Sequence, residues 1–219
     1  MSFTASQLEC GFGMEQLDAN KVVVAASTAA AEISNAGHIA KQLSLVAKNA
    51  RTVVLRAGDA ALGFKVVSDF FVELSTSSIF LVSQVNIVAI ELSRGAIECW
   101  DANRLSQKLD DVVLRHKEEE IEYFSSIEPS ISKGREGTAK LNDDLKHQIK
   151  KLSSLVDDIR QQMRAGKVIS VISRIEASRA GEFRQALEEM ADKVEALTER
   201  MIVHIQTAMT QLEEAQVNN

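Results

Sequence analysis

The fold of this 219-residue chain is decided by the stretch EFRQALEEMADKVEALTERMIVHIQTAM, residues 182–209. Its apolar residues recur at alternating steps of three and four, the heptad seam of a helix that packs against other helices. Charged residues fill the positions between, so the stretch predicts one long helix with a single buried face. The seam consists of Leu187, Met190, Val194, Leu197, Met201, His204 and Ala208.

The same rhythm occurs three more times, from Ile33 to Ala57, from Phe64 to Leu92 and from Leu145 to Met163. Each seam is long enough to predict a helix of many turns. The second predicted helix is far longer than the others, so it either overhangs its neighbours or breaks near 93–95 or 101–103. We expect the four helices over about 15–57, 60–126, 139–180 and 183–216.

Composition supports an all-α chain. There is 1 Pro, 10 Gly and only 5% aromatic residues, against 45% hydrophobic and 26% charged residues. A β-sandwich or a doubly wound α/β enzyme needs many more turn residues than this. A net charge of −6 argues against a nucleic-acid partner. We therefore predict long antiparallel helical hairpins that form a four-helix coiled-coil bundle.

The only proline, Pro129, lies in the Ser- and Gly-containing segment SSIEPSISKGREGT, residues 125–138. Such clusters mark loops, so we expect a loop near 127–137. This loop divides the chain into two similar halves. The predicted organisation is an N-terminal tail over 1–14, a first helical hairpin over 15–100, a connecting insert over 101–138 and a second hairpin over 139–219.

The two hairpin turns are related in sequence. Residues 56–59 read Arg-Ala-Gly-Asp and residues 179–182 read Arg-Ala-Gly-Glu, a shift of 123 residues. The same shift places Asp69 over Asp192 without a gap. The chain therefore reads as a tandem duplication of one helical hairpin.

Both turns also resemble a known family. The segment IEASRAGEFRQALEEMADKVEALTER (175–200) resembles the cytoplasmic signalling tip of methyl-accepting chemotaxis receptors, and residues 39–78 are similar to the same pattern. Those receptors are dimers in which each chain contributes one hairpin to a four-helix bundle. The resemblance implies that this single chain is a pseudo-dimer that carries both hairpins.

In that family the tip binds a coupling protein and a histidine kinase, so the resemblance implies a partner site at the tips. Glu176 and Arg179 share a helix face and can pair. Relative to the family pattern, the charges that follow Asp192 are exchanged, and apolar residues replace those that follow Asp69. Docking of the standard adaptor therefore stays open. The candidate residues are Asn49, Arg56, Gly58, Asp59, Gly63, Phe64, Asp69, Glu176, Arg179, Gly181, Glu182, Asp192 and Glu195.

A simpler interpretation applies to the turn residues themselves. Gly58 and Gly181 supply the backbone freedom that a turn requires. Asp59 and Glu182 are expected to cap the helix that follows each turn.

No pattern in the sequence predicts catalysis. The four histidines are dispersed, and none follows a glutamate by three residues as in di-iron bundles. His204 lies on the seam and is expected to act as a polar specificity residue there. Cys10 and Cys99 have neither disulfide-framework nor zinc-site spacing. We expect a non-enzyme without a cofactor or metal.

The apolar run Ile79–Leu92 is too short to span a bilayer as a helix, so we expect no transmembrane segment and a bacterial cytoplasmic location. The leading hypothesis is a chemoreceptor-like signal-transduction protein without a sensor domain, whose tips dock to a chemotaxis coupling protein or histidine kinase. Two alternatives are a structural scaffold that forms a homo-oligomer through the charge-poor first hairpin, and association of that hairpin with a membrane surface.

Overall fold

The computed structural model describes residues 19–115 and 124–217. Within these ranges the chain is helical and contains no strand. Short 3-10 helices, η3 (Gly58–Ala61) and η4 (Gly181–Phe183), form the two hairpin turns. The four long helices are α1 (Ala19–Ala57), α2 (Leu62–Arg115), α3 (Phe124–Ser178) and α4 (Arg184–Val217).

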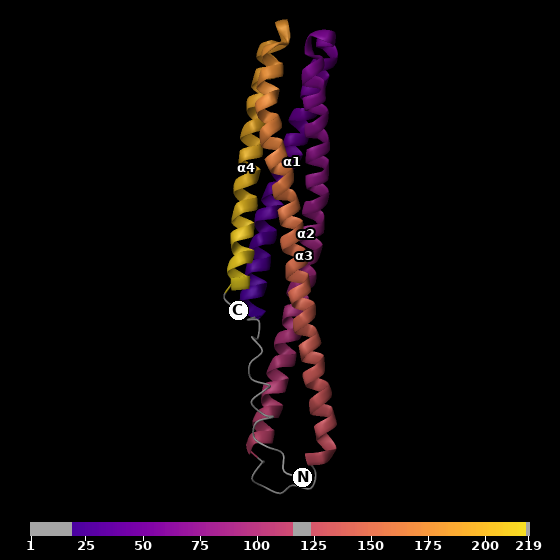
Figure 1. Ribbon diagram of the computed structural model, residues 1–219, viewed down its shortest axis with the longest axis vertical. Coiled ribbons are helices and arrows are strands. Elements are labelled where there is room, and N and C mark those ends of the chain that lie inside the picture. Colours follow the sequence, from indigo (N-terminus) through magenta and orange to yellow (C-terminus); the bar gives the residue numbers. More distant parts are fainter. Residues whose placement is uncertain (1–18, 116–123, 218–219) are drawn as a thin grey trace.

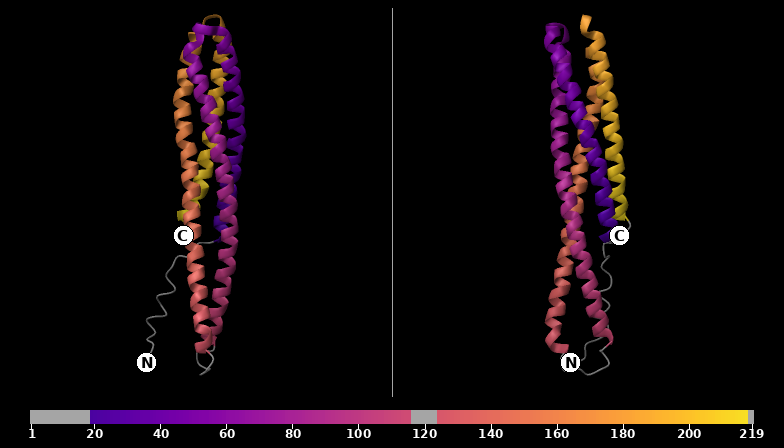
Figure 2. Two further views of the ribbon diagram at one scale, coloured as in Figure 1. Left: turned by 90° about the vertical axis from the view of Figure 1, so that its right-hand side faces the viewer. Right: turned by 180° about the vertical axis from the view of Figure 1, so that it is seen from behind.

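The helices form an antiparallel four-helix bundle, as the seams predicted. Helix α1 packs against α2 and α4, and α3 packs against the same two helices, so the order around the bundle is α1, α2, α3, α4. Both turns lie at the same end of a long rod (Figures 1 and 2). The two hairpins, α1–α2 and α3–α4, therefore stand side by side with their tips level.

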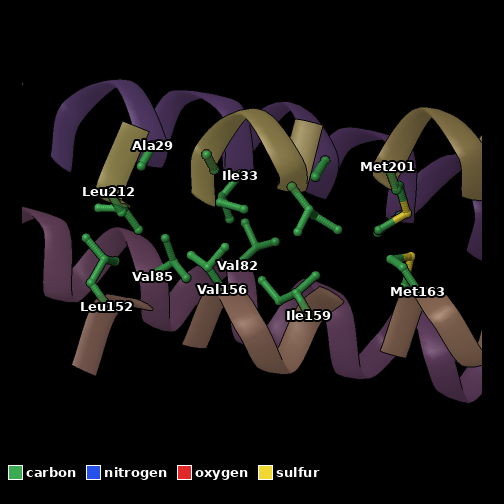
Figure 3. Close-up of a cluster of buried hydrophobic side chains, with 14 of the residues drawn as sticks. Ala29, Ile33, Val82, Val85, Leu152, Val156, Ile159, Met163, Met201 and Leu212 are labelled. Carbon is green, nitrogen blue, oxygen red and sulfur yellow. The ribbon is translucent and has the colours of Figure 1, made fainter. Parts of the chain in front are cut away.

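A column of buried side chains from all four helices runs along the rod, and a second cluster lies inside the tips. Met163 of α3 and Met201 of α4 point toward each other, and Leu152 points toward Leu212 (Figure 3). These four side chains are 0 to 3% exposed. Fully burying one such side chain stabilises a fold by about 1.5–3 kcal/mol, so this column holds the four helices together.

The duplication is visible in the core. The buried seam of α1 runs from Val22 to Val54 in steps of four and three residues. Adding 123 to the number of each residue in this seam gives a buried residue of α3. The side chains differ, because α1 carries alanine where α3 carries a large residue, whereas Leu43 is matched by Gly166. Close packing requires such compensation of volume across the core. The alanine pairs are Ala26 with Ile149, Ala29 with Leu152, Ala36 with Ile159 and Ala40 with Met163.

Helices α2 and α3 continue beyond the ends of α1 and α4 as a two-helix arm, which we define as residues 101–115 and 124–144 (Figures 1 and 2). Of the two alternatives for the second helix, the overhang is confirmed. The arm joins its helices by polar contacts. At its base the Cys99 thiol donates to Asn142 Oδ1 over 3.0 Å, and further out Asp110 pairs with Arg135. Desolvation raises the pKa of the Cys99 thiol.

The predicted loop near 127–137 is wrong, because α3 is already helical from Phe124 and contains Pro129. Pro129 is the sixth residue of α3, so its missing N–H removes one backbone hydrogen bond, to the carbonyl of residue 125. A Cβ on Gly134 or Gly137 would contact nothing within 4 Å, so each glycine costs only its helix propensity, about 1 kcal/mol. Pairing with α2 keeps this stretch helical.

The connecting insert is accordingly not a separate unit where it is described, since residues 101–115 continue α2 and residues 124–138 begin α3. The predicted N-terminal tail, 1–14, lies outside the described residues. The same holds for 116–123.

One helical stretch, Lys21–Val112, contains an 18-residue window that could cross a membrane by length and composition, with a mean hydropathy of 1.4. The stretch includes the turn at Gly58. Of that window, 39% is buried inside the bundle, and core helices of soluble proteins pass the same test.

Candidate functional site at the hairpin tips

Both hairpins turn on a glycine with a left-handed backbone. The φ angle is 58° at Gly58 and 57° at Gly181, and a Cβ added at either glycine would meet nothing within 4 Å. The requirement for glycine therefore comes from the backbone angle and not from crowding. This confirms the prediction that these glycines supply the turn.

The two acids after the glycines do not act as N-caps, so that expectation is wrong. The cap positions are Ala57 and Ala180, which make no side-chain cap hydrogen bond. Asp59 and Glu182 lie in the first turn of η3 and η4. Ala57, which precedes η3, has a right-handed helical backbone and not the extended backbone that is typical of an N-cap residue. Both carboxylates are exposed, so they place negative charge on the surface of the tips.

The two tips contact each other through Gly63 and Glu176. A Cβ on Gly63 would lie 1.8 Å from Glu176 Oε2 and 2.5 Å from its Cδ, so the glutamate side chain occupies the space above the glycine. Glu176 Oε1 also accepts a hydrogen bond from Arg179 Nη1 over 3.2 Å, which confirms the predicted pair. The structure thus brings together candidate residues from both copies of the duplicated hairpin.

On the other side of the paired tips, different residues occupy the positions equivalent to Glu176 and Gly63. The shift of 123 residues relates Glu176 to Val53 and Gly63 to Ala186. Val53 is partly buried against the apolar cluster inside the tips. The paired tips therefore carry a charged contact on one side and apolar residues on the other.

Asp69, Asp192 and Glu195 lie further down the hairpins and hold their helices together. Asp69 Oδ1 is 3.4 Å from Arg51 Nε. At the equivalent place Asp192 Oδ1 is 2.9 Å from Arg174 Nη2, and Glu195 Oε2 is 2.8 Å from the same nitrogen. The two arginines were missed by the sequence analysis, although the shift of 123 residues that aligns the aspartates also aligns them.

Phe64 is the candidate that the structure removes from the surface. It is 2% exposed and packs inside the tips with Val54, Ala177 and Leu187. Its side chain is therefore part of the core and not a contact residue. Asn49 and Arg56, in contrast, are exposed on α1.

Large apolar side chains surround the tips in positions that the sequence analysis did not single out. Leu55, Leu62 and Val66 are 71%, 56% and 71% exposed beside the first turn. Val171 and Ile175 are 54% and 48% exposed on the outer face of α3, close to the second turn. The tips thus combine apolar surface with the charges of Arg56, Asp59, Arg179 and Glu182, a composition suited to binding another protein.

His204 lies between α1 and α4. Its Nδ1 is 2.6 Å from Glu32 Oε2, and both side chains are about one quarter exposed, at 29% and 27%. The shift of 123 residues relates this pair to Leu81 and Leu155, which pack against the core between α2 and α3. His204 was expected on the buried seam, but the neighbouring Ile205, 1% exposed, takes the core position there. The pair of His204 and Glu32 therefore lies at the edge of the core, away from the tips.

A hollow of about 220 Å³ lies between α3 and α4, lined by Arg160, Arg164, Lys167 and apolar residues that include Met163 and Ile202. Pockets for small molecules usually measure about 300–1,000 Å³. In residues 19–115 and 124–217, no group of three or more His, Cys, Asp or Glu side chains could hold a metal ion. The tips are therefore the strongest candidate site.

Comparison with family models, with curated proteins and with solved structures finds no match for this chain, so its resemblance to chemoreceptor tips rests on the residues quoted above.

Proposed function

We propose that this chain is a cytoplasmic signal-transduction protein without a sensor domain, which docks through its paired hairpin tips to a chemotaxis coupling protein or a histidine kinase. In this proposal it acts by contact and not by catalysis. The observation that carries it is the placement of two Arg-Ala-Gly-acid turns next to each other at one end of the bundle.

The surface around these turns supports docking of a protein. Exposed leucine and valine side chains beside the first tip supply apolar area. The arginine and the acid of each turn add charges that can select a partner and speed its encounter. The pairing of Glu176 with Arg179 fixes one arginine, so part of this charge pattern is held in place before a partner arrives.

The single-chain architecture also supports the proposal. Two hairpins on separate chains assemble only above the dissociation constant of their dimer. In one chain the second hairpin is always present at a high effective concentration. The paired tips would therefore persist at the low concentrations of a signalling protein.

The test is a titration of the full chain against a chemotaxis coupling protein and its kinase from the same organism, by interferometry. Reversing the charge of both acids, Asp59→Lys with Glu182→Lys, is expected to weaken binding at least tenfold, because it inverts the charge that the tips present to a partner. The fold is expected to persist, because neither carboxylate occupies a cap position. The matched control is Glu213→Lys, an exposed acid near the opposite end of α4.

A second variant separates docking from stability. Arg56→Glu inverts the charge of an exposed arginine beside the first turn and leaves the contact between Gly63 and Glu176 intact, so it is expected to leave the unfolding midpoint close to wild type and to reduce binding. Absence of saturable binding at high micromolar concentration of the wild type would refute the proposal.

A scaffold that binds only itself is the second candidate. The observation that favours it is a row of exposed apolar side chains on α2, far from the tips.

A further inference from the structure

The outer face of α2, opposite the core, carries a second apolar seam. Phe80, Ile87, Ile90 and Ile97 recur at steps of seven, three and seven, and they are 62%, 50%, 54% and 58% exposed. The true core seam of this helix contains Val85, Val88 and Leu92, all nearly fully buried. An exposed row at heptad spacing is the pattern of a helix face that packs against another helix.

The bundle itself does not require these apolar residues. The shift of 123 residues relates Ile87 to Thr210 and Ile90 to Glu213 on α4, and both of these are exposed. At these two positions α4 meets water with polar side chains, whereas α2 keeps isoleucine; at the position equivalent to Phe80, α4 carries the exposed Val203. The difference points to something that covers α2 alone.

The charges along this seam identify a second copy of the chain as the partner. Four charged residues, Glu91, Arg94, Asp101 and Arg104, are arranged so that the order of signs reverses about a midpoint between Ile97 and Glu98. If two α2 helices lie antiparallel about that midpoint, Glu91 meets Arg104 of the other copy and Arg94 meets Asp101. In the described part of the chain neither Arg94 nor Asp101 has an intramolecular ion pair.

Local contacts favour this register. The guanidinium of Arg104 lies 5.2 Å from the ring centroid of Trp100, which holds the arginine at the edge of the seam. Ile90 of one copy would face Leu105 of the other, a residue that is 60% exposed. In the same register Ile87 would lie opposite Lys108, whose aliphatic stem can cover it.

The available area fits a dimer. The seam residues and Leu105 leave on the order of 500 Å² of apolar surface uncovered, near the upper end of the largest patch on a typical monomer. The stems of the flanking charged residues extend this contact toward the roughly 800 Å² per partner of a stable interface. We therefore propose that two copies of this chain associate antiparallel through the outer faces of their α2 helices. This proposal does not rest on the proposed function, because the tips lie elsewhere on the rod.

Sedimentation equilibrium of the full chain tests it. The wild type is expected to be dimeric at about 100 µM and to dissociate on dilution. Replacing Ile87 and Ile90 by the residues that α4 carries, Ile87→Thr with Ile90→Glu, is expected to weaken the dimer at least tenfold without loss of helical circular dichroism. Val203→Glu, which alters an exposed apolar residue of α4, serves as the matched control and is expected to leave the dimer unchanged.

Charge reversal tests the register. Arg94→Asp and Asp101→Arg are each expected to weaken the dimer at least tenfold, because each places like charges opposite one another. The double variant restores both pairs and is expected to recover the dimer. A parallel pairing or another face predicts no recovery.

Three results would overturn the proposal. They are a wild type that stays monomeric at about 100 µM, an unchanged dimer in Ile87→Thr with Ile90→Glu, or a double charge variant that stays monomeric. Sedimentation of the monomer with phosphatidylglycerol vesicles, lost in the same isoleucine variant, would assign the seam to a lipid surface instead.

Discussion

The two hairpins of this molecule have the same backbone and different contacts. Each turns on a glycine with the same φ angle, and the buried positions of α1 recur in α3 after the same shift. The residues at those positions have diverged, and at four of them alanine in α1 corresponds to a large side chain in α3. The comparison teaches that the heptad spacing of buried residues and a glycine with a left-handed backbone at each turn are enough to preserve the hairpin fold. The identity of each contact can change if the residue across the core changes with it.

The largest expected effect is in the core. Leu152→Ala is expected to lower the free energy of unfolding by about 2–5 kcal/mol, because it leaves a cavity, and Ala29→Leu by about 1–3 kcal/mol, because it overpacks the same level of the core. The double variant returns the lost volume to the opposite helix. Urea unfolding followed by circular dichroism measures all three.

We expect the double variant to be more stable than the sum of the single changes predicts. Strict additivity would show that α1 and α3 do not compensate each other at this level. The comparison of the two hairpins would then hold for the backbone only.

The two turn glycines should be equivalent. Gly58→Ala and Gly181→Ala each place a Cβ on a left-handed backbone in open space, so each is expected to cost about 1–2 kcal/mol. Thermal unfolding of both variants checks this. A difference of more than about 1 kcal/mol would mean that the tips store strain unequally.

The contact between Gly63 and Glu176 should decide whether Gly63→Ala lowers or raises the free energy of unfolding. Gly63→Ala alone is expected to cost about 1 kcal/mol, because the new methyl group displaces the Glu176 side chain from its place beside Arg179. In a Glu176→Val background, which reproduces the Val53 side of the tips, the same substitution is expected to gain about 0.5–1 kcal/mol from helix propensity. A double-mutant cycle in urea measures this coupling, and equal effects in both backgrounds would contradict it.

The smallest effect is expected for the ion pairs. Asp69→Asn and Asp192→Asn are each expected to cost less than about 1 kcal/mol, because both pairs are largely exposed. Asp192→Asn should cost no more than its counterpart, since Glu195 still pairs with Arg174. Raising the salt concentration should reduce both effects.

Much of the fold follows from the sequence in physical terms. The seam that contains Leu187 and Met201 predicts a packed helix, and the four seams together predict the bundle. The glycine turns follow from the repeated Arg-Ala-Gly-acid motif. The seam that begins at Phe64 could also have shown that this side chain is buried, because seam residues face the core.

The failures have equally physical causes. The cluster around Pro129 resembles a loop, but pairing between α2 and α3 overrides local propensity there. A capping Asp59 would lie just before its helix, whereas it lies inside the first turn of η3, and the residue at which that 3-10 helix begins is not visible in a sequence. The contact of Gly63 with Glu176 depends on how two hairpins meet, which neither hairpin encodes alone.

The covalent connection of the hairpins has an evolutionary consequence. In a two-fold symmetric homodimer, one mutation appears in both subunits, so a glutamate that needs a glycine opposite it would have to be accommodated at two places at once. In this chain a single codon change alters only one side of the tips. The covalent link also prevents the two hairpins from separating into independent chains. Glu176 and Gly63 can therefore be kept as a pair on one side of the tips while Val53 and Ala186 stand at the equivalent positions on the other side.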